Sequence, residues 1–434
     1  MADAALRLTA LAEELLGEKL PVRIRAWDGS ESGPPGAPVL IIRNRRALRR
    51  LLWKPGELGL ARAWVAGELD IEGDLYEALD LMASLIWDRG PEAEDSVHPV
   101  RDPKVRAFAR GLLQLAGPWL PPPPPPEEVR RRTGTLHTKR RDKEAISHHY
   151  DVGNDFYGLV LGPSMVYSCA YWEDDGNLED AQRDKLDLVC RKLALKEGDR
   201  LLDVGCGWGS MALHAAREYG ARVTGVTLSV EQAAYARKRI ADEGLTDRIE
   251  IRVQDYRDVR DGPYDAISSI GMAEHVGSVR FREYADDLYA LLRPGGRLLN
   301  HQIARRPEKD ESAYQVDEFI DAYVFPDGEL APVGRTVTTL EEAGFETRDV
   351  ESIREHYART LRSWVANLEK HWDRAVRMTS PGRARVWRLY MAASALSFEH
   401  NKIGVNQILV VRPAEGGASR MPLRARVWPA PTTG

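Results

Sequence analysis

The sequence predicts an α/β protein whose larger part is built on a doubly wound parallel sheet. From about Lys185 onward, short apolar runs typical of buried strands alternate with amphipathic helical patterns. A glycine-rich turn, LLDVGCGWGS at 201–210, follows the first of these strands and opens a helix. The length of 434 residues exceeds what one ordinary core holds, so we expect a second, smaller domain.

Residues 1–117 are expected to form this smaller accessory domain, of α/β or α+β type. Its start is an acidic amphipathic helix pattern without the features of a signal peptide. Alternating stretches at 20–29 and 37–44 predict strands, and helical patterns follow at 77–87 and 104–117. No cluster of His, Cys or paired carboxylates in this part indicates chemistry.

Residues 118–144 are expected to link the two domains. Six consecutive prolines at 121–126 predict a stiff extended spacer, or alternatively a docking segment for an aromatic groove. The basic stretch at 130–143 is either a solvated tract or a contact with anionic phospholipid head groups. Nucleic acid is a third alternative, against which the lack of interleaved aromatic residues argues.

Residues 145–412 are expected to form the larger domain, and 413–434 a flexible tail rich in Pro, Gly and Arg. Helices of the larger domain are predicted to begin near Met211, Val230 and Phe281. Its predicted strands cover 200–205, 222–228, 249–255, 264–271, 296–303 and 406–411. Ligands of such a sheet bind at the carboxyl ends of the strands.

Composition and charge restrict the class of protein. No apolar run reaches the roughly 18 residues that span a bilayer. The net charge of −5 means that attraction to nucleic acid or an anionic membrane must be local. Three cysteines, Cys169, Cys190 and Cys206, argue against a disulfide scaffold and fit a reducing cytoplasm.

The strand ends indicate the cofactor. Asp203 precedes three glycines in the pattern D-x-G-x-G-x-G, which differs from the dinucleotide fingerprint and suits a small cofactor with an amino-acid end. The second strand ends in Thr227, where a nucleotide-binding sheet usually has an acid for the ribose. The third ends in Asp255, which can accept the exocyclic amine of adenine. Together they predict S-adenosylmethionine rather than NAD, and we expect no metal.

Several motifs resemble the cyclopropane fatty acid synthase family. They are YSCAYW at 167–172, GVTLSVEQ at 225–232, VQDYRD at 253–258 and GMAEHVG at 271–277. The resemblance runs from about residue 148 to 411, and the N-terminal half resembles the accessory domain of full-length bacterial members. It implies a Rossmann-like methyltransferase that uses S-adenosylmethionine to alkylate a cis double bond in a phospholipid acyl chain.

The resemblance also implies the site residues. Methyl transfer leaves a carbocation, and a bound bicarbonate ion is the implied base that removes a proton from it. The implied bicarbonate site is formed by Cys169, Glu274, His301, Tyr357 and the backbone amide of Ile303. The cofactor residues are Asp203 with Tyr167, Ser168, Gly205, Gly207, Gly209, Thr227, Leu228, Gln232, Asp255 and Tyr256. Purely structural roles stay open as alternatives: Cys169 could fill space in the core, and Glu274 could cap the helix that follows it.

Two departures from the family pattern bear on the product. Ser394 stands where some members carry a Cys, which excludes thiol chemistry there. Ala273 precedes Glu274, where ring-forming members commonly have Phe. The change at Ala273 lies next to the base and could let the cation lose a different proton, and the segments 298–307 and 319–330 resemble the actinobacterial 10-methylstearate or tuberculostearate branch. We therefore favour a methylene-branched product, with cyclopropane ring formation as the alternative.

The expected partners follow from this activity. They are an unsaturated phospholipid at the membrane surface and a reductase that acts on the product, without nucleic acid. We expect a homo-oligomer in the cytoplasm, bound peripherally to the inner face of the membrane. The rival interpretations are a non-catalytic lipid carrier and a small-molecule or nucleic-acid methyltransferase. Glu274, His301 and Tyr357 argue against the carrier, which has no use for a base site.

Overall fold

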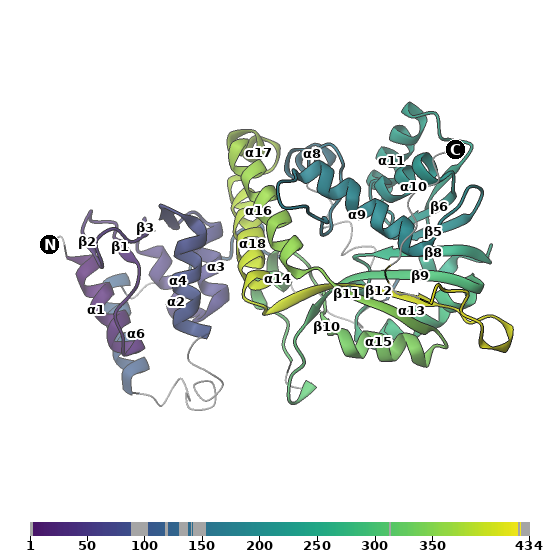
Figure 1. Ribbon diagram of the computed structural model, residues 1–434. Helices are drawn as coiled ribbons and strands as arrows, with labels where there is room; N and C mark the ends of the chain where they lie inside the picture. Colours follow the sequence, from purple (N-terminus) through teal and green to yellow (C-terminus); the bar gives the residue numbers. More distant parts are fainter. Residues whose placement is uncertain are drawn as a thin grey trace. The chain divides into compact units, whose positions relative to one another are not determined.

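The computed structural model describes two compact units (Figure 1). The described residues are 3–87, 103–117, 120–129, 138–139, 141, 153–311, 314–423 and 426. Most of the basic stretch 130–143, and the tail beyond 423 except residue 426, lie outside them. The N-terminal unit comprises Met1–Arg131, Asp317–Val324 and Thr379–Leu396, and the C-terminal unit contains the rest of the chain.

The N-terminal unit packs helices against a small mixed sheet. Its strands have the order β2-β1-β3-β4, with β1 and β3 parallel and the other pairs antiparallel. Leu8, Ile24, Ile42 and Leu48 are among its buried core residues. The elements are α1 (Ala4–Leu16), β1 (Arg23–Arg25), β2 (Glu31–Ser32), β3 (Val39–Ile42), α2 (Arg46–Trp53), α3 (Glu57–Val65), β4 (Leu69–Glu72), α4 (Leu75–Trp87) and α6 (Pro103–Ala116).

Helices α2 and α3 and strand β4 were not predicted from the sequence. α2 buries only Ala47, Leu48 and Arg50 along an arginine-rich stretch, so its apolar face is too short to show a clear helical period. The Arg50 guanidinium pairs with the Glu68 carboxylate at 2.8 Å, and both side chains are buried. A charged pair thus occupies a position where the pattern would have called for an apolar residue.

The proline stretch belongs to the N-terminal unit. Arg50 Nη1 donates to the Pro123 carbonyl at 2.9 Å, and Pro125 is buried. Two later segments also join this unit, α14 (Glu318–Tyr323) and most of α18 (Pro381–Glu399). The Trp64 indole of α3 donates to the Arg385 carbonyl at 2.9 Å, and the Arg385 guanidinium lies over the Trp64 ring. The structural division therefore differs from the contiguous stretches 1–117 and 145–412.

The C-terminal unit is built on an eight-stranded sheet. Its order is β11-β12-β9-β8-β5-β6-β7, with β10 beside β9. β9, β8, β5, β6 and β7 run parallel, whereas β12 is antiparallel to both neighbours. The strand order reverses at β5, and sheets of this kind bind their ligands in a crevice at the carboxyl ends of the strands beside the reversal, here β5 and β8. The strands are β5 (Arg200–Val204), β6 (Arg222–Thr227), β7 (Ile249–Val253), β8 (Tyr264–Ile270), β9 (Leu292–Arg305), β10 (Ala331–Pro332), β11 (Glu346–Ser352) and β12 (Ile403–Val411).

All six predicted strands are present, and the Rossmann-like fold is confirmed. The sheet is not wholly parallel, because β11 and β12 add an antiparallel edge. β11 was missed because its sequence, ETRDVES, is mostly charged and polar. Its carboxylates face a buried amine instead: Glu351 accepts a hydrogen bond from Lys192 Nζ.

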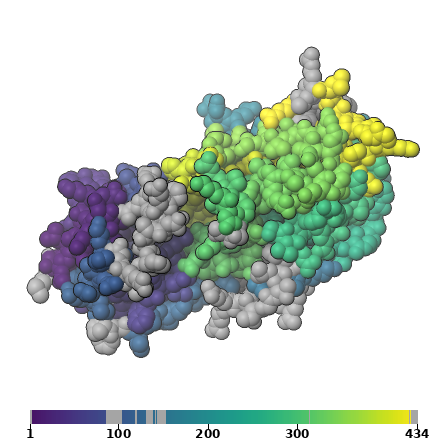
Figure 2. Space-filling view, turned by 90° about the horizontal axis from the view of Figure 1, so that it is seen from below, coloured from purple at the N-terminus to yellow at the C-terminus, as the bar shows by residue number. Residues whose placement is uncertain are grey.

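Helices cover both faces of the sheet (Figure 1). α9, α10 and α11 pack with Leu201 and Leu299 on one face, and α13 and α15 pack with Leu202 and Leu298 on the other. Adjacent residues of one strand thus enter opposite cores, as strand pleating requires. Figure 2 views this unit from the α13 and α15 side. The helices are α8 (Asn154–Leu161), α9 (Leu178–Leu193), α10 (Ser210–Tyr219), α11 (Val230–Asp242), α12 (Ala273–Val276), α13 (Ser278–Leu291), α15 (Val333–Glu342), α16 (Arg354–Lys370) and α17 (Trp372–Met378). Among the described residues, no helix is long and apolar enough to cross a membrane.

Candidate active site

The glycine turn between β5 and α10 needs its glycines. Gly205, Gly207 and Gly209 have φ angles of 76°, 52° and 81°, a region that side chains disfavour. A Cβ at Gly205 would lie 2.3 Å from the Met272 sulfur. The Gly205 amide donates to the Val226 carbonyl of β6 at 3.0 Å, which holds the turn against the neighbouring strand. The turn therefore brings bare backbone to the carboxyl end of the sheet.

Asp203 offers a buried acceptor beside this turn. Its Oδ1 accepts a hydrogen bond from the Ser268 hydroxyl at 2.8 Å, and its Oδ2 has no partner among the described residues. Burial raises the pKa of Asp203 to about 6, and the Ser268 hydroxyl and the nearby Lys185 oppose this rise. A buried acceptor without a donor fits the ammonium of an amino-acid cofactor, and the glycine-lined backbone fits its carboxylate. These residues fit S-adenosylmethionine.

The ends of β6 and β7 lie side by side, since Thr227 and Val253 are register partners. The Thr227 hydroxyl donates to Gln232 Oε1 at 2.9 Å, and half-buried Leu228 follows it. Asp255 is held by the guanidinium of Arg257 at 2.7 Å, which contributes to keeping the pKa of its carboxyl below the usual value against the opposing effect of burial. These side chains are ordered by their own neighbours before any ligand binds.

Tyr256 is buried next to this pair and stacks edge-on against Tyr284, with ring centroids 5.6 Å apart. The predicted cofactor residues Asp255 and Tyr256 thus follow β7, and Thr227, Leu228 and Gln232 lie at the neighbouring end of β6.

Glu274 and Ile303 are in direct contact at the other side of the crevice. Glu274 Oε1 accepts a hydrogen bond from the Ile303 amide at 2.7 Å, whereas its Oε2 is shielded from solvent without a partner among the described residues. Burial raises the pKa of Glu274 to about 7, although the Ile303 amide acts in the opposite direction. The side chain can therefore gain or lose a proton near neutral pH.

His301 sits two residues earlier on β9, beside Ile270 at the end of β8. It is buried, and burial together with Lys185 and Lys192 keeps its pKa well below the usual value, so the imidazole is neutral. Its Nδ1 lies 3.4 Å from Gln407 Nε2. If that amide donates to Nδ1, then Nε2 carries the hydrogen. Nε2 has no partner among the described residues.

Cys169 and Tyr357 both lie near the start of α16. The Cys169 thiol lies 3.7 Å from the Ile353 carbonyl, just before that helix. Burial raises the pKa of this thiol well above its usual value, so it is protonated. Tyr357 packs against Trp364 and Phe398, with ring centroids 6.0 and 4.7 Å away. Tyr167 contacts Trp364 as well, at 5.4 Å, so Trp364 links a predicted cofactor residue to a predicted base-site residue.

Lys185 is a buried charge that sequence reasoning missed. Its side chain is 1% exposed, and Nζ donates to the Ser168 hydroxyl at 2.9 Å. It interacts electrostatically with Cys169, Asp203 and His301, and burial lowers its pKa to about 8. It therefore connects the cofactor side of the crevice with the base side. The sequence signal for its burial is its position four residues after Ala181, because residues four apart lie on the same face of a helix and this face of α9 is buried.

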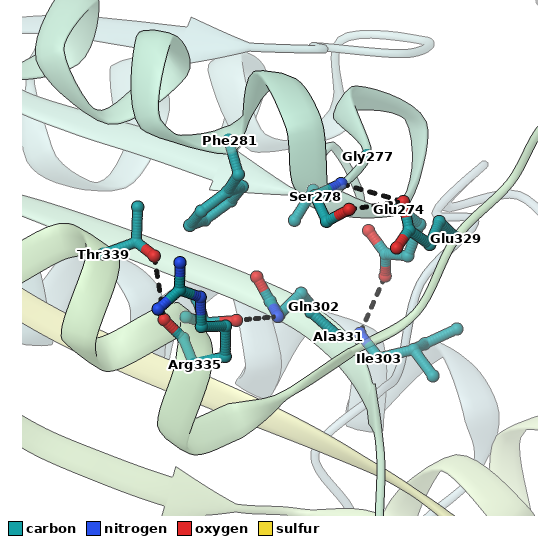
Figure 3. A pocket seen from close by; sticks show the side chains of 12 residues that line it. Glu274, Gly277, Ser278, Phe281, Gln302, Ile303, Glu329, Ala331, Arg335 and Thr339 are labelled. Carbon is teal, nitrogen blue, oxygen red and sulfur yellow. Dashed lines mark hydrogen bonds between the residues drawn. The ribbon is translucent and has the colours of Figure 1, made fainter. Parts of the chain in front are cut away.

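A small cavity adjoins Glu274 (Figure 3). Its volume is about 40 Å³. It is lined by residues of α12, α13, β9, β10 and α15 and of the turns before α13 and β10, namely Ala273, Glu274, Gly277, Ser278, Phe281, Gln302, Ile303, Glu329, Ala331, Arg335, Thr336 and Thr339. Within the described ranges, no group of three or more His, Cys, Asp or Glu side chains is arranged to hold a metal.

The fold and the crevice define an S-adenosylmethionine-dependent methyltransferase. A solved mycolic acid cyclopropane synthase, complexed with SAH and CTAB, matches this chain at 32% identity and a TM-score of 0.59, covering 62% of this chain and 98% of that one. The chain belongs to the mycolic acid cyclopropane synthetase family, whose model matches residues 137–408.

Three curated relatives extend the match into the N-terminal half. A probable fatty acid methyltransferase of Mycobacterium tuberculosis is 44% identical, covering 93% of this chain and 94% of its own length. The cyclopropane-fatty-acyl-phospholipid synthase of Escherichia coli K12 is 33% identical, covering 87% and 88%. The tuberculostearic acid methyltransferase of Mycobacterium tuberculosis is 31% identical, covering 93% and 91%. The family resemblance, the fold class and the enzyme class are thereby confirmed.

Proposed function

We propose that this enzyme transfers a methyl group to the cis double bond of an unsaturated phospholipid acyl chain and then removes a proton. The observation that carries the proposal is Glu274, a carboxyl of pKa about 7 held against the Ile303 amide at the end of the sheet that binds the cofactor. A group that titrates near neutrality can accept a proton from a bound base and release it again, so it suits a reaction that ends in proton removal. The names of the three relatives, all enzymes of fatty acids or fatty acyl lipids, support the substrate class.

The residues of the crevice suit a reaction with a strong alkylating agent. S-adenosylmethionine, when bound, supplies an electrophilic methyl group. The glycine turn and Asp203 would hold its amino-acid end, and Thr227, Gln232 and Asp255 its nucleoside. The protonated Cys169 thiol is a poor nucleophile, since the thiolate is the reactive form. The site thus protects its own cysteine from alkylation.

We infer that bicarbonate is the base, held by Cys169, Glu274, His301, Tyr357 and the Ile303 amide. The donor set fits a small anion, because a thiol and a phenol are neutral donors, and the Ile303 amide becomes a third when the anion replaces Glu274 Oε1 as its acceptor. His301 Nε2 is a further donor when Gln407 donates to Nδ1. The buried Lys185 ammonium, close to Cys169 and His301 in electrostatic terms, favours a negative charge here.

We favour a methylene-branched product over a cyclopropane ring. Ala273 lines the cavity beside Glu274, so the space that a Phe would fill in ring-forming members is open here. A small residue beside Glu274 leaves that side chain, which helps to hold the base, more room to shift, and a shifted base removes a different proton of the cation. Replacing Ala273 by Phe should shift the product ratio toward the ring, and an unchanged ratio would remove Ala273 from the argument.

The remaining parts of the proposal concern partners and location. We propose peripheral binding to the inner face of the membrane, a homo-oligomer, and a reductase that acts on the branched product. Two described residues of the basic stretch are already paired with acids, Lys139 with Asp258 and Arg141 with Asp327, each at 2.6 Å. Head-group contact therefore has to come from the other basic residues of that stretch.

The test is product formation on defined vesicles. Purified protein is incubated with S-adenosylmethionine and vesicles of dioleoyl phospholipid, and the released acyl chains are analysed by gas chromatography and mass spectrometry. Vesicles of a saturated phospholipid serve as the matched substrate control. We expect a one-carbon gain only in the oleoyl chains. No gain despite cofactor binding would favour the lipid-carrier interpretation.

A further inference from the structure

The cavity beside Glu274 lies on the opposite face of β9 from His301. Along β9, residues 299 and 301 face α9, whereas 298, 300 and 302 face α13 and α15. Leu299 and Leu298 confirm this alternation, since they belong to the two separate cores. Gln302 and Phe281 line the cavity, so it opens on the α13 and α15 side. Glu274 lines this cavity and accepts the hydrogen bond of the Ile303 backbone amide.

The interior of the cavity carries two buried acceptors without donors. They are Glu274 Oε2 and Gln302 Oε1, neither of which has a partner among the described residues. Gln302 is 2% exposed, and its Nε2 donates to the Thr336 hydroxyl at 2.8 Å. This bond fixes the amide so that its carbonyl points into the cavity (Figure 3). Buried acceptors of this kind are normally satisfied by protein or by ordered water.

The cavity has the size and polarity that water requires. Its volume of about 40 Å³ exceeds what one water needs, roughly 10–15 Å³ on this measure. Ser278 and Thr339 line it together with the two acceptors. Their hydroxyls already donate to the Glu329 carboxylate and to the Arg335 carbonyl, so toward water they act as further acceptors. Ser278 and Arg335 are exposed, which places the mouth of the cavity at the surface.

We propose that this cavity is a water-filled exit through which Glu274 passes the proton of each turnover to solvent. The inference rests on the proposed function, in which one proton leaves the alkylated acyl chain per methyl group transferred. The Glu274 carboxylate takes up that proton from the bicarbonate that the proposed function places beside it, which restores the bicarbonate, and becomes the neutral acid. A cavity water then accepts it as hydronium and restores the carboxylate, so charge and protons balance. The exit is separate from the crevice that holds the cofactor.

The surroundings of Glu274 allow this cycling. The charged and titratable groups near it are His275 on α12, Tyr284 on α13, His301 on β9, Arg335 on α15 and Glu329 in the loop before β10. His301 is neutral, and the Glu329 carboxylate is occupied by the amide and hydroxyl of Ser278, at 2.9 and 3.0 Å. Burial is therefore the main influence on the pKa of Glu274. The access of water to the cavity determines how strongly the carboxyl is desolvated.

The test removes polar groups from the cavity wall. Gln302→Met keeps the side-chain length but removes the carbonyl, and Thr339→Val is an isosteric change that removes a buried hydroxyl. Thr338→Val is the matched control, because Thr338 is exposed on the same helix. The first readout is an infrared pH titration of the cofactor-free protein, with the Glu274 carboxyl band identified by its loss in Glu274→Gln. We expect the midpoint to rise by about one pH unit in both cavity variants and to stay unchanged in the control.

The second readout compares the first turnover with later ones. In rapid-quench experiments, the cavity variants should complete the first methyl transfer at the wild-type rate and then slow about tenfold, because proton release has become limiting. Unchanged titration midpoints, or an equal loss in first and later turnovers, would overturn the proposal. A wild-type protein that methylates no lipid would instead refute the proposed function, and the titration would still decide whether the cavity hydrates Glu274.

Discussion

Replacing Glu274 by Gln should make the protein inactive and, at alkaline pH, more stable. Burial raises the pKa of this carboxyl from 4.5 to about 7. At about 1.4 kcal/mol per pH unit, charging it costs the folded state on the order of 3 kcal/mol. Gln keeps an oxygen for the Ile303 amide but cannot ionise. The substitution therefore removes the cost of the charge and the proton acceptor together.

The sign of the pH dependence follows from the direction of the pKa change. Since the folded-state pKa lies above the unfolded value, the folded protein binds more protons between pH 4.5 and about 7. The wild type loses stability as the pH rises through this window, and the Gln variant does not. The variant should be more stable by up to about 3 kcal/mol above pH 7, with no difference near pH 4.5.

Thermal denaturation at pH 8 and pH 5 measures this difference. For a unit of this size we expect a Tm increase of roughly 5–10 °C at pH 8 and little change at pH 5. Glu283→Gln, which alters an exposed carboxyl on α13, is the control and should leave both values unchanged. S-adenosylmethionine should still bind to the Gln variant, while turnover falls by more than about a hundredfold. Equal stability of variant and wild type at pH 8 would refute the claim that Glu274 is buried with a pKa near 7.

Three further predictions concern the cofactor turn, the buried lysine and the N-terminal unit. Gly205→Ala should abolish cofactor binding in calorimetry, because its Cβ would approach a methionine sulfur to 2.3 Å, whereas Gly244→Ala, also at positive φ but in open space, should bind normally. Lys185→Met should weaken S-adenosylmethionine binding about tenfold at neutral pH, because without Lys185 the pKa of Asp203 rises and its carboxyl is less ionised for the cofactor ammonium, and unchanged affinity would contradict this role. Arg50→Met should destabilise the N-terminal unit by about 3 kcal/mol in urea denaturation, since Glu68 loses its buried partner; a loss below about 1 kcal/mol would show the pair to be dispensable.

The sequence predicted the parallel part of the sheet because buried strands and glycine turns leave strong local signals. Apolar runs end at Thr227 and Asp255, and the glycines of the turn are required by backbone angles that few other residues adopt. Glu274 and Ile303, 29 positions apart, were paired by family resemblance alone, and the structure places them in contact. The separation of two residues in the sequence does not predict a contact of this kind.

Other features depend on packing between distant segments and were missed. Lys185 resembles any solvated helix lysine until the fold buries it against Ser168. The sequence of β11 resembles a loop because it is mostly charged and polar. It forms a strand because a buried amine from α9 pairs with one of its acids, a contact that the local sequence does not show. Helix α18 contributes to the N-terminal unit because the Arg385 guanidinium and carbonyl meet Trp64, 321 positions earlier. Local pattern and composition carry no information about such contacts.

The most direct test of the proposed reaction follows the methyl carbon itself. S-adenosylmethionine labelled with ¹³C in its methyl group is incubated with the enzyme and dioleoyl phospholipid vesicles, and the intact lipid is examined by NMR. The account predicts that the label appears in the acyl chain as an olefinic methylene carbon. A label in a cyclopropane methylene would contradict the branched product, and an unlabelled lipid would contradict methyl transfer to the acyl chain.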